Sequence, residues 1–208
     1  MTPVQKRGWL SLLLCIAVVV IDQLVKFEIK TNFSLYESYH ITDWFQLVFT
    51  ENRGMAFGMQ FVGTMFLAIF RIVAIAFFAL VLVRLVRRKA PWGVVVCVAM
   101  VIAGAAGNIF DNFFYGLIFS ESLPAAAPAT LVPFGEGYGS FLTGRVVDMF
   151  YFPFFTWPDW VPLLGGDVFF GAIFNVADAS ISCGAVALAL FYYKYLAEAG
   201  VFRLRCHA

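Results

Sequence analysis

The sequence predicts an all-α membrane protein with four transmembrane helices, a small exported β-element and a segment that lies on the membrane surface. Two observations carry this prediction. Hydrophobic residues make up 62% of the 208 positions and charged residues only 13%, which is more apolar side chain than a soluble core of this size can bury. The apolar residues also gather in four runs, each close to the ~20 residues that a helix needs to cross the hydrocarbon layer.

The first apolar run, about 8–27, follows Lys6 and Arg7 and therefore resembles a secretory signal. Because no small-x-small cleavage site follows and the run ends in Asp22-Gln23, we interpret it as a retained transmembrane helix. We expect the four helices and their loops to form a single domain, 1–208. The other three helices are expected at about 63–83, 92–110 and 174–195.

The positions of lysine and arginine predict the orientation of these helices. Nine of the fourteen basic residues lie before the first helix, between the second and third, or at the end of the fourth helix and beyond it. These three places are on the same side of the membrane, so the positive-inside rule predicts that both termini are cytoplasmic. Two loops, about 29–62 and 117–173, are then exported.

The two exported loops differ from ordinary linkers. In the first, Phe45, Leu47 and Phe49 alternate with more polar positions until the chain breaks after Asn52, which predicts a small sheet or hairpin. In the second, prolines and alanines predict an irregular connection over 123–133. The dense aromatic residues of 151–160 favour the headgroup layer, so we expect this segment to lie along the membrane surface.

Polar groups from distant parts of the chain are expected at one depth, the outer membrane edge. The first and third helices run outward toward this edge, and the fourth starts there. Carboxylates beside hydrocarbon are costly and usually mark a functional site. The residues expected to meet at this edge are Asp22, Lys26, Asn108, Asp111, Asp148, Asn175 and Asp178.

The spacing of these residues suggests local pairs. Asn108 and Asp111 are three positions apart, as are Asn175 and Asp178, so each pair shares a helix face and each asparagine can orient its neighbouring carboxylate. Asp22 and Lys26 are four apart, which predicts an intrahelical ion pair with an anchoring role.

Taken one at a time, the two aspartates Asp148 and Asp178 also have ordinary structural explanations. A carboxylate at a helix start is favoured by the macrodipole, which would explain Asp178. Asp148 could pair with Arg145 in a surface loop. Their convergence with other polar groups instead indicates a paired-carboxylate mechanism or an ion pathway.

Several classes of function are disfavoured by the sequence. The net charge of +1 and the lack of a dense basic run argue against nucleic acid. The four cysteines and two histidines show no metal-ligand spacing, so we expect neither a metal nor an organic cofactor. No nucleophile motif of a serine or cysteine hydrolase is present in the sequence.

Five ordered sequence boxes resemble the signatures of the lipoprotein signal peptidase (signal peptidase II) family. Together they cover nearly the whole chain, and five boxes in order are much more specific than any one alone. The boxes are Asp22-Gln23-Leu24-Val25-Lys26, Asn52-Arg53-Gly54-Met55-Ala56-Phe57, Gly107-Asn108-Ile109-Phe110-Asp111, Val146-Val147-Asp148 and Phe174-Asn175-Val176-Ala177-Asp178.

This resemblance implies an aspartyl endopeptidase of the bacterial cytoplasmic (inner) membrane, with its active site near the outer face. Its substrates would be diacylglyceryl-modified prolipoproteins, cut just before the lipidated cysteine, and its partners these substrates and membrane lipid. The resemblance implies a catalytic dyad of Asp148 and Asp178 and inhibition by globomycin-type antibiotics, and we expect a monomer. Supporting roles are implied for Asp22, Lys26, Asn52, Gly54, Asn108, Asp111 and Asn175.

Two features depart from the family pattern. Asn112 stands where the family usually has an arginine, and Arg145 or Arg71 would have to supply that charge to the substrate. Asp111 and Asp148 are also 37 positions apart, where a short turn is expected, so most of 117–143 is an insertion. With the aromatic segment, this insertion could form an enlarged exported lid.

Two other classes of membrane protein are the alternatives. In a proton- or cation-coupled transporter, Asp22, Asp111 and Asp178 would form a relay. The gathering of carboxylates at one face and the lack of an evident inverted repeat count against this function. A purely structural membrane subunit would not need converging carboxylates.

Overall fold

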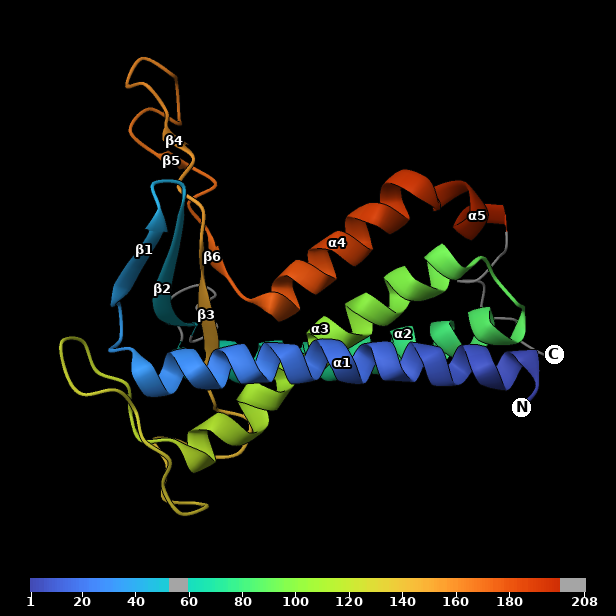
Figure 1. Ribbon diagram of the computed structural model, residues 1–208, viewed down its shortest axis with the longest axis horizontal. Coiled ribbons are helices and arrows are strands. Elements are labelled where there is room, and N and C mark those ends of the chain that lie inside the picture. The colour runs from blue at the N-terminus through green and yellow to red at the C-terminus, as the bar shows by residue number, and fades with distance from the viewer. Residues whose placement is uncertain (53–59, 199–208) are drawn as a thin grey trace. The chain divides into compact units, whose positions relative to one another are not determined.

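The computed structural model describes residues 1–52 and 60–198. It divides into two compact units. The first unit consists of Met1–Asp22, Ile69–Ile109 and Val176–Ala208, and the second of Gln23–Ala68 and Phe110–Asn175. Figure 1 shows the chain coloured along its length.

Three long apolar helices supply the candidate membrane spans in the described part of the chain. They are α1 (Pro3–Asn32), α2 (Gln60–Arg87, with its apolar stretch at Met65–Arg87) and α3 (Trp92–Ile118). Each is longer than the run that predicted it, and all three predicted helices are confirmed. Their length and apolar composition are those of membrane-spanning helices, and three such helices indicate a multi-pass membrane protein.

The fourth predicted helix differs from its expected bounds of about 174–195. Helix α4 covers only Val176–Phe191, with 16 residues, and α5 (Tyr193–Glu198) follows after a bend at Tyr192. The predicted start is also wrong, because Ile173–Phe174 forms strand β6 rather than helix. At 1.5 Å per residue α4 is about 24 Å long, which is shorter than the ~30 Å hydrocarbon layer.

The turn between α2 and α3 shows why the chain reverses there. Lys89 adopts a positive φ of 53°, and the N–H groups of Lys89 and Ala90 donate to the carbonyls of Val86 and Leu85. This pair of hydrogen bonds is a Schellman motif, which satisfies the last carbonyls of a helix. Pro91 follows and precedes α3, where its missing N–H costs nothing.

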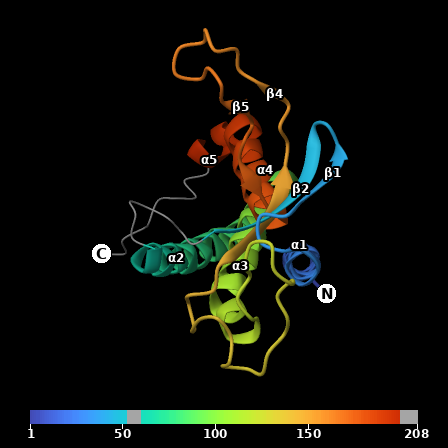
Figure 2. The ribbon, with the colours of Figure 1, turned by 90° about the vertical axis from the view of Figure 1, so that its left-hand side faces the viewer.

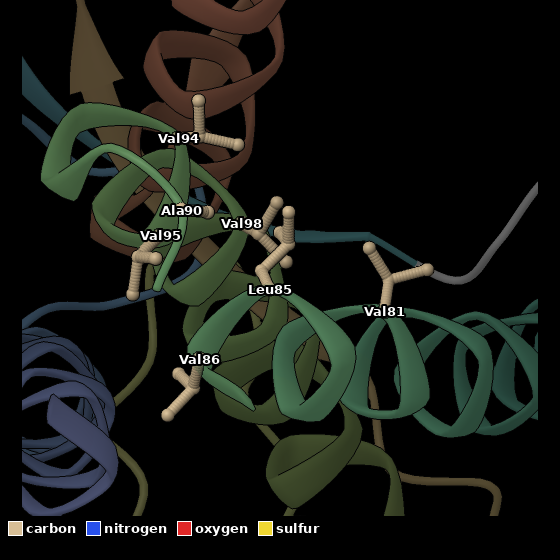
Figure 3. Close-up of a cluster of buried hydrophobic side chains, with 7 residues drawn as sticks. All are labelled: Val81, Leu85, Val86, Ala90, Val94, Val95 and Val98. Carbon is tan, nitrogen blue, oxygen red and sulfur yellow. The ribbon is translucent and has the colours of Figure 1, made fainter. Parts of the chain in front are cut away.

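The core of the first unit lies beside this turn. Figure 3 shows seven buried side chains from the end of α2, the turn and the start of α3. Their interdigitation removes apolar surface from contact with any solvent and fixes the two helices against each other. The cluster consists of Val81, Leu85, Val86, Ala90, Val94, Val95 and Val98.

Helices α3 and α4 approach closely at glycines. A Cβ at Gly104 would lie 2.2 Å from the carbonyl oxygen of Ala177, and a Cβ at Gly184 would lie 2.7 Å from that of Cys97. Only glycine allows the two backbones this separation, as is common between membrane helices. The close contact at Gly104 brings the middle of α3 against the first turn of α4.

The second unit is built on a four-stranded sheet of order β1-β2-β3-β6 (Figures 1 and 2). The hairpin β1 (Ser38–Thr42) and β2 (Phe45–Asn52) confirms the predicted β-element, and β3 is Val146–Tyr151. Strands β2 and β3 are antiparallel. Leu47 pairs with Phe150 but Thr50 with Asp148, so β2 carries a bulge between these positions.

One face of this sheet packs on the ends of α1 and α3 within the second unit. The buried residues come from all of these elements and enclose the aromatic rings of Tyr115 and Phe119, whose centroids are 4.9 Å apart. The cluster consists of Ile29, Leu35, Phe49, Tyr115, Phe119, Val147 and Met149.

The inserted segment, 117–143, is irregular over 123–133, as the prolines and alanines there predict. Beyond the end of α3 it forms only isolated bridges in the described structure, but its backbone is tied to its surroundings at several points. Leu35 N donates to Leu123 O, Val132 N to Ile118 O and Tyr138 N to Phe119 O. The segment therefore folds back on the end of α3 instead of extending away from it.

The aromatic segment forms a separate arm. Strands β4 (Phe155–Thr156) and β5 (Val168–Phe169) pair antiparallel, and the rings of Phe155 and Phe169 stack with centroids 4.8 Å apart. Between these strands Trp160 is 81% exposed and Leu163 fully exposed. Its placement at the membrane surface stays a prediction.

Candidate active site

Asp148 lies in the middle of β3 and is nearly buried, at 5% exposure. This placement differs from the surface loop considered in the sequence analysis, because the insertion ends before Val146 and leaves Asp148 inside the sheet. Asn175, which directly follows β6, donates from Nδ2 to Asp148 Oδ1 at 2.6 Å and to Val147 O at 3.2 Å. One amide group therefore fixes both the carboxylate and the strand that carries it.

Asp178 lies in the first turn of α4, in the other unit. Asn108 of α3 donates from Nδ2 to Asp178 Oδ1 at 2.7 Å. The helix macrodipole also favours a carboxylate at this position. The close approach of α3 and α4 at Gly104 puts Asn108 within reach of this carboxylate.

Each of the two asparagines has a hydrogen-bond partner that its spacing in the sequence did not suggest. Asn108 shares a helix face with Asp111 but contacts Asp178, and Asn175 precedes Asp178 by three positions but contacts Asp148. Spacing along one helix identifies neighbours on that helix only, and these partners come from long-range packing.

A second pair of contacts fixes the backbone just before each aspartate. Ala177 N donates to Asp22 Oδ1 at 2.9 Å, and Val147 N donates to Asp111 Oδ2 at 3.3 Å. The first contact satisfies one of the N–H groups that a helix start leaves without an intrahelical partner. In both units a buried carboxylate thus binds the residue that precedes Asp178 or Asp148.

Asp111 has two further donors in the second unit. Lys26 Nζ lies 2.8 Å from its Oδ2, and Gln23 Nε2 donates to its Oδ1 at 2.8 Å. Both members of the Lys26–Asp111 ion pair are fully buried. The predicted pairing of Lys26 with Asp22 stays a prediction.

Asn112, which stands in place of the family arginine, has a structural role in this chain. Its Nδ2 donates to Gly144 O at 2.7 Å, and Gly144 N donates back to Asn112 O at 3.1 Å. The side chain is buried. These two hydrogen bonds close the inserted segment just before β3 begins.

Two carboxylates bind the guanidinium group of Arg145, the residue that was predicted to contact the substrate. Its Nη1 donates to Glu51 Oε2 at 3.1 Å and its Nη2 to Glu121 Oε1 at 2.9 Å. Burial lowers the pKa of Arg145, but the hydrogen bonds to Glu121 and Glu51 outweigh that effect and the pKa is raised. Its charge is thus matched inside the protein, while Arg71 lies in α2.

The residues Asn52 and Gly54 belong to the second sequence box. Asn52 ends β2, opposite Val146, and is exposed. Gly54 lies outside the described residues. Within the described ranges no three His, Cys, Asp or Glu side chains are grouped to hold a metal ion.

Glu51 also belongs to this region, although the sequence did not predict it. Its side chain is only 1% exposed and accepts hydrogen bonds from Lys30, Ser122 and Arg145. Its only local signal is a lone glutamate one position before the predicted break of the strand. Alternation alone cannot distinguish such a residue from a solvent-exposed one.

Comparisons with known proteins agree with the five sequence boxes. The family model described as "Signal peptidase (SPase) II" matches residues 14–194. The lipoprotein signal peptidase of Porphyromonas gingivalis (strain ATCC BAA-308 / W83) is 43% identical, over 89% of this chain and 84% of its own. That of Amoebophilus asiaticus (strain 5a2) is 32% identical, over 89% of this chain and 78% of its own.

A solved structure supports the fold. The protein titled "Bacterial membrane enzyme structure by the in meso method at 1.9 A resolution" has a TM-score of 0.58 at 23% identity. It covers 88% of this chain and 93% of its own chain. The predicted resemblance is confirmed, and the chain belongs to the signal peptidase II family of peptidases.

Proposed function

We propose that this protein is an intramembrane aspartyl endopeptidase that removes the signal peptide from diacylglyceryl-modified prolipoproteins, just before the lipidated cysteine. Membership of the family supports this function, as does the name lipoprotein signal peptidase of the relatives. The observation that carries the proposal is the matched support of two aspartates. Asn175 donates to Asp148 and Asn108 to Asp178, and all four residues belong to the family boxes.

Asp148 and Asp178 form the proposed catalytic dyad. Asn175, which contacts Asp148, stands three residues before Asp178, so the chain limits the distance between the Cα atoms of Asn175 and Asp178 to about 11 Å. Two carboxylates close together do not both ionise easily, and such a pair shares one proton. One member then acts as a base and the other as an acid.

The proposed reaction needs no metal and no organic cofactor. The ionised carboxylate takes a proton from a water molecule as the water attacks the scissile carbonyl carbon, and the protonated carboxylate donates to the developing oxyanion. The C–N bond of the tetrahedral intermediate then breaks. The carboxyl group that took the proton from water gives it to the leaving amine, and the other carboxylate recovers its proton from the hydroxyl group of the intermediate. The two asparagine amides orient the carboxylates throughout.

The other family residues are proposed to position the dyad. Asp22 binds the backbone before Asp178, and the Lys26–Asp111 pair binds the backbone before Asp148. We propose supporting roles for Asn52 and Gly54 from their place in the second box. We also propose that Arg145 contacts the substrate. Its side chain is 15% exposed, and only the N–H groups that do not bind Glu51 or Glu121 are available for this contact.

The site is proposed to lie near the outer face of the bacterial cytoplasmic membrane, in a monomer with four membrane spans and both termini in the cytoplasm. Lipid then holds the acyl chains of the substrate while its peptide bond enters the polar site. The aromatic arm would lie in the headgroup layer. Globomycin-type antibiotics are proposed as inhibitors.

The function is tested with purified protein in nanodiscs and a synthetic prolipoprotein, with and without its diacylglyceryl group, followed by mass spectrometry. Asp148→Asn and Asp178→Asn are each expected to abolish cleavage while leaving the folded protein in the membrane. Asp43→Asn, an exposed aspartate in the β1–β2 turn, is the matched control. Cleavage near the parental rate in either catalytic variant, or ion flux in liposomes without cleavage, would contradict the proposal.

A further inference from the structure

A buried network of polar side chains in the second unit centres on Glu51 of β2. Its Oε1 accepts hydrogen bonds from Lys30 Nζ at 2.5 Å and from Ser122 Oγ at 2.9 Å. Its Oε2 accepts one from Arg145 Nη1 at 3.1 Å. The side chains of Glu51 and Lys30 are 1% and 0% exposed. Both oxygens of a fully buried carboxylate are thus bound by groups from three other segments.

The inserted segment encloses this network with aromatic rings. Lys30 Nζ lies 5.3 Å from the ring centroid of Phe119 and 5.0 Å from that of Tyr138, while Arg145 Cζ lies 4.8 Å from that of Tyr138. Such rings attract cations through their faces. Burial raises the pKa of Tyr138, so its hydroxyl stays protonated; the hydroxyl oxygen accepts the backbone N–H of Arg145 at 2.8 Å.

The two cations of the network depend on Glu51 to different degrees. Lys30 is fully buried and its paired carboxylate is Glu51, so loss of that negative charge leaves an uncompensated positive charge in the interior. Arg145 also pairs with Glu121, which is 49% exposed. Glu51 is therefore the member whose removal disturbs the network most.

The sheet connects Glu51 to the catalytic strand. Glu51 pairs with Val147 of β3, and its neighbour Thr50 pairs with Asp148. Since successive side chains alternate between faces, Glu51 and Asp148 lie on opposite faces of the sheet. Arg145, bound by the same carboxylate, stands three positions before Asp148. Glu51 thus reaches Asp148 through the backbone and not by direct contact.

We propose that Glu51 is a positioning residue for the peptidase reaction. Its side chain lies on the face of the sheet opposite Asp148, where it holds Lys30, the inserted segment and Arg145 against the strand that carries Asp148. The inference rests on the proposed function. It makes 117–143 part of the scaffold of the site. A displacement of a reacting group by about 1 Å can lower a rate about a hundredfold, so small shifts of β3 are enough to affect cleavage.

Glu51→Gln tests this role because it keeps the shape of the side chain and removes its charge. We expect kcat per folded molecule to fall at least about tenfold, with KM changed by less than about twofold because the side chain is on the face away from Asp148. Glu28→Gln, a matched change at an exposed position of α1, should leave both constants unchanged. A purely structural role would lower thermal stability and leave kcat per folded molecule unchanged, which would overturn the proposal.

The double variant Lys30→Met/Glu51→Gln tests whether removing the unpaired lysine restores the kcat that Glu51→Gln loses. It leaves no uncompensated charge, and the carbonyl of the new amide can still accept from Arg145, so kcat should recover to within about threefold of the parent. A double variant no more active than Glu51→Gln would overturn the proposal. If Glu51→Gln does not fold, Ser122→Ala takes its place, and parental kcat in that variant would contradict the inference.

Different results would contradict the proposed peptidase function and the proposed role of Glu51. The parent is measured first with lipidated prolipoprotein, and a parent that does not cleave this substrate contradicts the proposed function. A parent that cleaves, together with a fully active Glu51→Gln variant, contradicts only the role of Glu51.

Discussion

Asn175 donates from Nδ2 to Oδ1 of Asp148 at 2.6 Å, although the two residues are 27 positions apart in the chain. The same amide donates to Val147 O, so it connects the Asp148 side chain to the strand that carries it. Asn108 provides the corresponding contact for Asp178. In each case the preceding backbone N–H is bound by a buried carboxylate, Asp111 or Asp22. Each aspartate is thus oriented by two contacts, one at its side chain and one at its backbone.

Asn175→Ala is therefore expected to lower kcat by about tenfold to a hundredfold, because Asp148 loses its orienting donor while its carboxyl group remains. Asn108→Ala should do the same through Asp178. Both are measured by mass-spectrometric cleavage of lipidated prolipoprotein. Asn32→Ala, at an exposed position near the end of α1, is the control. Parental kcat in both active-site variants would show that the amides do not orient the carboxylates.

The Lys26–Asp111 ion pair predicts a strong effect on stability. Lys26→Met leaves Asp111 without its ammonium partner, and breaking a buried pair by removing one member costs about 3–5 kcal/mol. The free energy of unfolding in detergent should fall by that amount, while Lys194→Met, at an exposed position of α5, should change it little. The double variant Lys26→Met/Asp111→Asn should recover only part of the loss. It removes the uncompensated charge, but the single oxygen of the amide can accept from Gln23 or from Val147 and not from both. Equal stability of Lys26→Met and the parent would contradict this account.

The main lines of the fold were predictable from local patterns. Apolar runs predicted α1, α2 and α3, and alternation from Phe45 predicted β2. The predicted start of the fourth helix was wrong because Ile173 and Phe174 are as apolar as the helix that follows. Only their pairing with Tyr151 and Phe150 makes them a strand. Short apolar runs do not distinguish these two structures.

The candidate site was predictable as a set of residues but not as a set of contacts. The family boxes identified the aspartates and asparagines, whereas the partner of each asparagine depends on packing between distant elements. The role of Asn112 also came from a long-range contact, with Gly144. The local signal at Glu51 did not indicate its role, because its three partners lie 21, 71 and 94 positions away.

Gly104 permits the contact of α3 with α4, and its substitution should affect both stability and activity. A Cβ there would lie 2.2 Å from the carbonyl oxygen of Ala177, which is backbone and cannot move aside alone. Gly104→Ala should therefore separate the helices, destabilise the protein by about 1–3 kcal/mol and weaken the Asn108–Asp178 contact. Gly8→Ala is the matched control, since a Cβ at Gly8 has nothing within 4 Å. Thermal unfolding and cleavage are measured for both, and an unchanged Gly104→Ala variant would contradict the close approach.

The aromatic arm offers a test of the predicted membrane-surface segment. Trp160 is 81% exposed at its end, and indole rings favour the headgroup layer. In nanodiscs, the fluorescence difference between the parent and Trp160→Phe should be quenched by lipids brominated near the headgroup more strongly than by aqueous iodide. Trp44→Phe is a useful comparison, because Trp44 stacks on Phe152 and Phe154 at centroid distances of 6.3 and 6.4 Å. Stronger quenching of the Trp160 signal by iodide would place the arm in water and separate it from the membrane surface.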